Sequence, residues 1–134
     1  MRFVGFNFTK ISVEKKSDNF KDLKITTNID VSEIKPVKNE ILKQKEELVG
    51  IKFKFSVEYK KDVAEIELDG NILAAIDPKE AKELMKQWKD KKMPEDFRIP
   101  LFNVIIRKSS IKALELEDEM NLPLHVPLPT IRKE

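Results

Sequence analysis

Apolar and polar residues alternate along the first half of the chain, and this pattern predicts β-strands. The strictest alternation covers residues 51–60, where five large apolar residues share one face: Ile51, Phe53, Phe55, Val57 and Tyr59. A face this apolar beside a polar one predicts a strand buried on one side and solvated on the other. The alternation resumes over residues 63–75 after a short polar turn, so the two segments predict a hairpin. Gly70, inside the second segment, predicts a bulge or a close backbone contact.

Two weaker strand patterns precede this hairpin. Residues 3–16 alternate with one slip between Phe8 and Ile11, where a bulge would restore the face. Residues 23–33 keep apolar side chains at odd positions, and Pro36 closes that run. The spacing over residues 36–49 fits a helix about as well as an extended edge or crossover, and both interpretations stay open.

From Asp77 onward the pattern becomes helical. Asp77 is a suitable N-cap, Pro78 fits the first helical position, and Glu80 supplies the acid of a capping box, which predicts a helix over residues 78–92. A second, longer helix is expected over residues 98–119, opened by Asp96 and Pro100. Residues 121–134 then alternate Leu or Val with Pro and predict an extended, polyproline-like segment.

Strands followed by helices predict one α+β domain over residues 1–134. We expect a four-stranded antiparallel sheet within about residues 3–76, with two C-terminal helices packed on one face. The length of 134 residues suits a single domain. Internal repeats and a dividing linker are absent from the sequence.

Composition argues against most enzyme chemistry. The chain has one His, no Cys and three Gly, and it lacks a Gly-rich phosphate loop, a serine-hydrolase elbow and a paired-His metal motif. His125 is expected to be a packed or solvated side chain, and the acids at 115 and 117–119 are expected on an exposed helix face. We therefore expect no catalytic residues, no metal, no cofactor and no enzymatic activity.

Charge and hydropathy limit the cell compartment and the class of protein that the sequence suits. With 26 Lys+Arg against 24 Asp+Glu the formal net charge is +2, and 37% of the residues are charged. Such ion-rich, glycine-poor composition resembles that of thermophile proteins. No apolar run reaches the length of a signal peptide core or a membrane span, so we expect a cytoplasmic protein without a membrane span.

Two kinds of binding are compatible with these patterns. Lys52, Lys54 and Lys60 line one strand face, but the aromatic residues of that strand lie on the other face, and base stacking needs both together. The pattern therefore favours a buried aromatic face over nucleic-acid binding, which stays as an alternative. The helices and the C-terminal segment also carry more large apolar residues than one layer over a sheet requires. That surplus predicts a neighbouring subunit, an apolar groove for a partner, or both.

The order of elements resembles the SecB family of protein-export chaperones. Residues 98–107 (RIPLFNVIIR) look like the start of that family's long helix, and residues 121–128 (NLPLHVPL) look like its Pro- and Leu-rich exit. The hairpin from Lys52 to Leu73, which contains Gly70, fits the family's third and fourth strands.

The resemblance implies an ATP-independent holding chaperone, built as a dimer of dimers, that keeps non-native client polypeptides in apolar grooves. The client-binding residues expected on this basis are Phe53, Phe55, Tyr59, Met85, Trp88, Phe97, Phe102 and Leu124. The residues expected at an oligomer interface are Ile105, Ser109 and Ser110.

The chain also departs from the familiar members of the family, which dock the SecA motor through an acidic surface. A net charge of +2 and the basic pair Arg132-Lys133 do not suit that docking, so SecA is a doubtful partner. A more distant branch, including chaperones that guard an antitoxin, fits better. A subunit that docks one dedicated protein partner is a further alternative to the holding chaperone.

Overall fold

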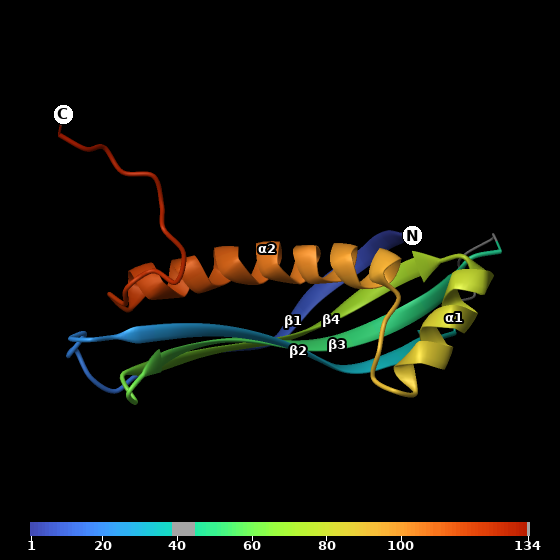
Figure 1. Cartoon of the computed structure of the whole chain (residues 1–134), viewed down its shortest axis with the longest axis horizontal. Helices are drawn as coiled ribbons and strands as arrows, with labels where there is room; N and C mark the ends of the chain where they lie inside the picture. Colours follow the sequence, from blue (N-terminus) through green and yellow to red (C-terminus); the bar gives the residue numbers. More distant parts are fainter. Residues whose placement is uncertain (39–44, 134) are drawn as a thin grey trace.

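The computed structural model describes residues 1–38 and 45–133 and shows a sheet with helices against it (Figure 1). The elements are β1 (Arg2–Lys15), β2 (Lys24–Val37), β3 (Glu47–Lys60), β4 (Ala64–Ile76), α1 (Pro78–Trp88) and α2 (Glu95–Glu119). The long helix α2 runs across the sheet, and α1 lies at the end where β4 finishes (Figure 1). The α+β fold with a four-stranded antiparallel sheet and two C-terminal helices is confirmed.

The sheet has the order β1-β4-β3-β2, and every neighbouring pair is antiparallel. The predicted hairpin β3-β4 forms its centre, because these two strands have the strictest apolar face. Phe55 pairs with Leu68 and Phe53 with Gly70 in this hairpin, so their buried faces coincide and form the floor of the core. β1 and β2 are left as the two edges.

Both irregularities predicted for the sheet are present. The pairing of β1 with β4 shifts register between Phe8 and Lys10, where the sequence indicated a bulge. At Gly70 a Cβ atom would lie 2.7 Å from the carbonyl oxygen of Asn7 and 2.7 Å from the Phe53 ring. The glycine therefore lets the neighbouring strand and an aromatic ring approach the backbone closely.

The ambiguous segment 36–49 is extended at both ends. Pro36 pairs with Val49 and Val37 with Leu48, so these residues prolong β2 and β3. The middle of the segment, residues 39–44, lies outside the described residues, so the choice between a helix and an extended edge or crossover stays open there.

Helix α1 has the predicted cap but ends earlier than expected. The Asp77 carboxylate accepts a hydrogen bond from the backbone N–H of Lys79 at 2.8 Å, and Pro78 occupies the first turn. The helix stops at Trp88 and not at residue 92, because Lys91 takes a left-handed conformation with φ of 59°. The N–H of Lys92 then bonds back to the carbonyl of Gln87, which closes the helix end.

Helix α2 begins at Glu95, three residues before the predicted start at 98. The N–H groups of Phe97 and Arg98 both bond to the carbonyl of Pro94, so the first turn forms ahead of Pro100. Pro100 lies inside the helix and not at its opening, and it removes one backbone hydrogen bond. No helix in residues 1–38 and 45–133 is both long and apolar enough to cross a membrane.

The C-terminal segment folds back before it leaves the body. Asn121 adopts a left-handed conformation with φ of 53°, and the N–H of Leu122 bonds to the carbonyl of Glu117. This turn buries Leu122 in the core. Residues 127–133 are exposed and extend away from the sheet without helix or strand (Figure 1).

Candidate functional site

A groove of about 470 Å³, lined by both apolar and polar residues, lies between the edge strand β2 and the helices. It is lined by Ile29, Asp30, Val31, Ser32, Trp88, Lys91, Met93 and Phe102. Three separate parts of the chain meet here: the middle of β2, the end of α1 with its following loop, and the first turns of α2. The turn at Lys91 sets this geometry, because it redirects the chain from α1 into α2 beside the sheet edge.

Trp88 and Phe102 are the two predicted client-binding residues that the structure brings together in this groove. Both are partly buried against the core, so each presents part of its ring to the groove. The Lys91 Nζ lies 4.6 Å from the centre of the Trp88 ring, a distance at which a cation and an aromatic face attract each other. The exposed Lys91 side chain therefore stabilises the position of Trp88 at the edge of the groove.

The groove also adjoins unpaired backbone. Strand β2 pairs with β3 on one side only, and no strand of the described part of the chain covers its other edge. An extended peptide can bind such an edge through main-chain hydrogen bonds while neighbouring pockets take its side chains. A groove that combines apolar side chains with a free strand edge is therefore suited to an extended polypeptide that carries apolar side chains.

The other predicted client-binding residues lie elsewhere. Phe53, Phe55 and Tyr59 are 2%, 0% and 1% exposed, because they form the core floor within their own chain. They do not line the groove, so the prediction that they form its floor is corrected. Met85 is half-buried against the core, and Phe97 is buried in a different pocket, at the start of α2. Leu124 is half-buried in the C-terminal segment.

Two of the three residues predicted at an oligomer interface are not on the surface of the single chain. Ile105 and Ser109 are fully buried within their own chain, on the row of α2 residues that faces the sheet. The apolar residues that α2 leaves exposed are Ile99, Ile106 and Ile111, at 50%, 44% and 53%. The sequence does not separate the two sets, because α2 is apolar on more than one side and either side fits a buried stripe.

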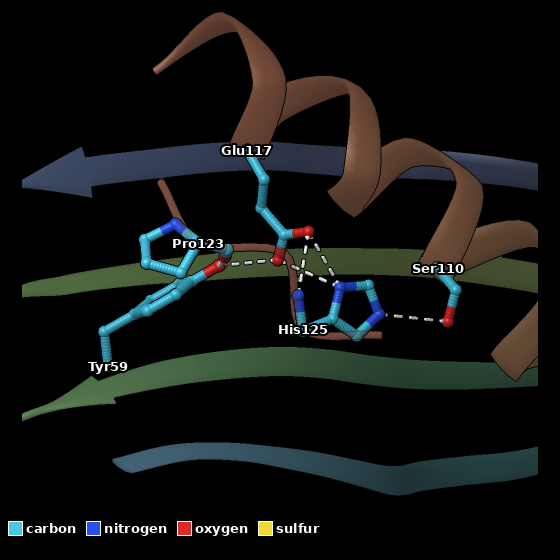
Figure 2. A network of polar contacts seen from close by, with 5 residues as sticks. All are labelled: Tyr59, Ser110, Glu117, Pro123 and His125. Atoms are coloured by element: carbon cyan, nitrogen blue, oxygen red, sulfur yellow. Dashed lines mark hydrogen bonds and ion pairs between the residues drawn. The ribbon is translucent and has the colours of Figure 1, made fainter. Parts of the chain in front are cut away.

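A buried polar network that the sequence pattern does not predict joins β3, α2 and the C-terminal segment (Figure 2). The carboxyl group of Glu117, which is 0% exposed, contacts the Tyr59 hydroxyl at 2.6 Å and the His125 Nδ1 at 2.9 Å. The backbone N–H of His125 donates to Glu117 Oε1 at 3.2 Å, and the Tyr59 hydroxyl also lies 2.7 Å from the carbonyl oxygen of Pro123. Glu117 was expected on an exposed face, and the returning segment is what covers it.

Burial, followed by the hydrogen bond and the charge of Glu117, raises the pKa of the Tyr59 hydroxyl above its ordinary value. The phenol therefore keeps its proton and stays a donor at neutral pH. A phenol has one proton, so Glu117 and Pro123 share a single donor. The network fixes the first part of the C-terminal segment on the sheet.

The order Ser110, His125, Glu117 resembles the contacts of a hydrolase triad, since His125 Nε2 lies 3.3 Å from Ser110 Oγ. The surroundings do not support catalysis. The His125 side chain is 1% exposed, and Ser110 lies within α2, whose ladder occupies the backbone N–H groups that an oxyanion hole would need. Within the described residues, no three His, Asp or Glu side chains are grouped to hold a metal ion.

The sheet face opposite α2 carries the lysines considered for nucleic acid. Lys52 pairs with Glu33 at 3.2 Å, and Lys54 lies 3.7 Å from Glu67. Hydrogen bonding and charge from Lys10 lower the pKa of Glu67, and those from Lys52 lower the pKa of Glu33. Both acids are thus ionised at neutral pH and offset the charges of Lys52 and Lys54. This mixed surface does not favour nucleic-acid binding.

Comparison with known proteins adds one finding. No protein-family model and no curated protein matches the sequence. Among solved structures, the fold is similar to that of the Mycobacterium tuberculosis SecB-like chaperone Rv1957, solved in complex with a ChAD peptide from the Rv1956 HigA1 antitoxin. The TM-score is 0.53 at 11% sequence identity, over 99% of this chain and 92% of that chain. The predicted SecB-like fold is confirmed by this similarity.

Proposed function

We propose that this protein is an ATP-independent holding chaperone that binds non-native polypeptides in the groove between β2 and the helices. The observation that carries the proposal is that Trp88 and Phe102 line the same groove beside a free strand edge. The similarity to a SecB-like chaperone that was solved with a bound peptide supports it.

The chemistry of the groove suits an unfolded client. A non-native chain exposes apolar side chains together with unpaired backbone groups, and the groove offers partners for both. Met93 is flexible and the rings of Trp88 and Phe102 are tolerant of shape, so the groove can bind many apolar sequences. Burial contributes about 25 cal/mol per Å² of apolar surface, less the cost of ordering the client.

Assembly is part of the proposal. Ile99, Ile106 and Ile111 lie on the surface that α2 leaves exposed in the single chain. A helix that is apolar on both sides is ordinarily buried on both sides. We infer that a second copy covers this face and that the assembly is a dimer of dimers.

Aggregation suppression tests the function. A client protein is diluted from denaturant without nucleotide, and its light scattering is followed with increasing amounts of the chaperone. We expect suppression at about one client chain per assembly, and a strong loss of it in the double variant W88A/F102A. The variant I11A, which trims an exposed apolar side chain on β1 outside the groove, is the matched control.

Absence of suppression by the folded parent protein would overturn the proposal. Suppression of only one client among several would favour a dedicated partner over a general holding function. The peptide bound to Rv1957 comes from an antitoxin, so an antitoxin is the kind of dedicated partner to include in the panel.

A further inference from the structure

A second pocket, of about 420 Å³, lies at the opposite end of α2 from the buried network. It is lined by Met1, Phe3, Ile76, Glu80, Glu83, Pro94, Asp96, Phe97 and Pro100. Its floor is apolar, and its rim carries three exposed carboxylates and no basic side chain. Within the described residues, none of these three carboxylates forms an ion pair. The pocket is therefore complementary to an apolar side chain flanked by positive charge.

The C-terminal segment carries a group of that kind. Ile131 is fully exposed to solvent, and the next two residues are Arg132 and Lys133. Burying so exposed an isoleucine side chain in an apolar site lowers the free energy, because apolar surface is removed from water. The two cations beside it match the acidic rim.

In its own chain the segment leads away from this pocket, because residues 127–133 extend away from the sheet (Figure 1). His125 contacts both Glu117 and Ser110, and Ser110 lies about 20 Å from Phe97 along α2, at 1.5 Å per residue. The chain from His125 to Ile131 spans at most about 20 Å, so it would have to be fully extended back along α2 to reach the pocket. A second copy can supply the segment without this constraint.

We propose that Ile131, Arg132 and Lys133 of one copy bind in the acidic-rimmed pocket of a second copy. Two copies with antiparallel α2 helices bring the C-terminal segment of each beside the α2 start of the other. Ile131 then lies against Phe3 and Phe97, while Arg132 and Lys133 face Glu83 and Asp96. The site is incomplete without the partner copy, and it does not depend on client binding.

Cysteine cross-linking tests the exchange, because the chain has no cysteine of its own. The full-length single variants I131C and E83C, both at exposed positions, are mixed and oxidised. We expect a disulfide-linked product of two chains, and background amounts from I131C mixed with N19C, whose cysteine lies in the β1-β2 connection. Equal yields from the two mixtures would overturn the proposal. So would a linkage within one chain in the double variant I131C/E83C.

Charge reversal gives a second test. If the cross-link formed by random collision, its yield would not depend on the charges beside the two cysteines. R132E/K133E in the I131C chain should lower the yield about 2- to 10-fold, since exposed ion pairs are individually weak. E80K/D96K in the E83C chain should restore it. An unchanged yield after reversal, or no recovery in the doubly reversed pair, would contradict the charge complementarity.

Discussion

The hydroxyl of Tyr59 lies 2.6 Å from Oε2 of Glu117 and joins strand β3 to the last turn of α2 across the buried core. His125 approaches the same carboxyl group from the C-terminal segment, with its Nδ1 2.9 Å from both oxygens. A polar contact between groups this buried holds the end of the long helix and the returning segment on the sheet.

Removing the phenol hydroxyl tests this role. In Y59F the carboxyl of Glu117 and the carbonyl of Pro123 lose their shared donor while they stay buried. We expect the free energy of unfolding to fall by about 1–3 kcal/mol, measured by denaturant titration. The control is E115Q, which removes the exposed partner of Lys112 and should change stability by less than about 0.5 kcal/mol. Equal, small effects of both variants would contradict a stabilising network.

The same environment predicts an alkaline titration. Tyr59 is the only tyrosine, so tyrosinate absorbance reports this residue alone. Its pKa is raised in the folded chain, so near pH 10 the unfolded chain ionises first. The contribution to stability is therefore complete below about pH 10 and is lost as the pH rises further.

We expect the unfolded chain to ionise near pH 10 and the native chain to show no tyrosinate there. The variant Y59F should lack this part of the alkaline loss of stability. A native midpoint near pH 10 would contradict the buried hydrogen-bonded geometry.

Gly70 allows a close approach that no other residue permits. In G70A the new Cβ meets both a backbone oxygen and the Phe53 ring at 2.7 Å, so the variant should lose about 1–3 kcal/mol of stability. G5A is the matched control, because its Cβ would meet only the Leu73 side chain, at 3.5 Å. Denaturant titration of both variants should separate them, and equal stabilities would show that β1 and Phe53 adjust without cost.

The exposed face of α2 predicts assembly through Ile106. I106K places a charge on the surface that we propose a second copy covers, and the mass in solution should fall from that of an oligomer to that of a smaller species. Sedimentation velocity measures this, with I11K as the control, since Ile11 is similarly exposed on β1. A monomeric parent protein, or an I106K variant with the parent's mass, would contradict the proposed assembly.

The sequence predicts most of the sheet. In a strand with one buried and one solvent-exposed face, the alternation of apolar and polar residues follows the burial of the side chains. The bulge after Phe8 and the contact at Gly70 follow from a slip in that pattern and from a glycine among large residues. The helix boundaries are predicted less accurately, because local turns set them. Pro100 fits a helix start, but the first turn of α2 forms before it, through bonds to the Pro94 carbonyl.

The functional residues are predicted only in part. Trp88 and Phe102 stand out as apolar residues in excess of the core, and they meet in the groove. Glu117 appears as one acid among several at a helix end, and nothing local distinguishes it. Its burial depends on Tyr59, far earlier in the chain, and on a segment that turns back at Asn121. Such contacts are set by tertiary structure and leave no periodic signal.

The central claim is that a non-native polypeptide binds beside Trp88, and fluorescence tests it most directly because Trp88 is the only tryptophan. A client without tryptophan is titrated in two forms, folded and trapped unfolded by chemical modification. We predict a saturable blue shift of Trp88 emission and reduced quenching by iodide with the unfolded form, and no change with the folded form. An unchanged spectrum with the unfolded client, or the same change with both forms, would contradict the claim.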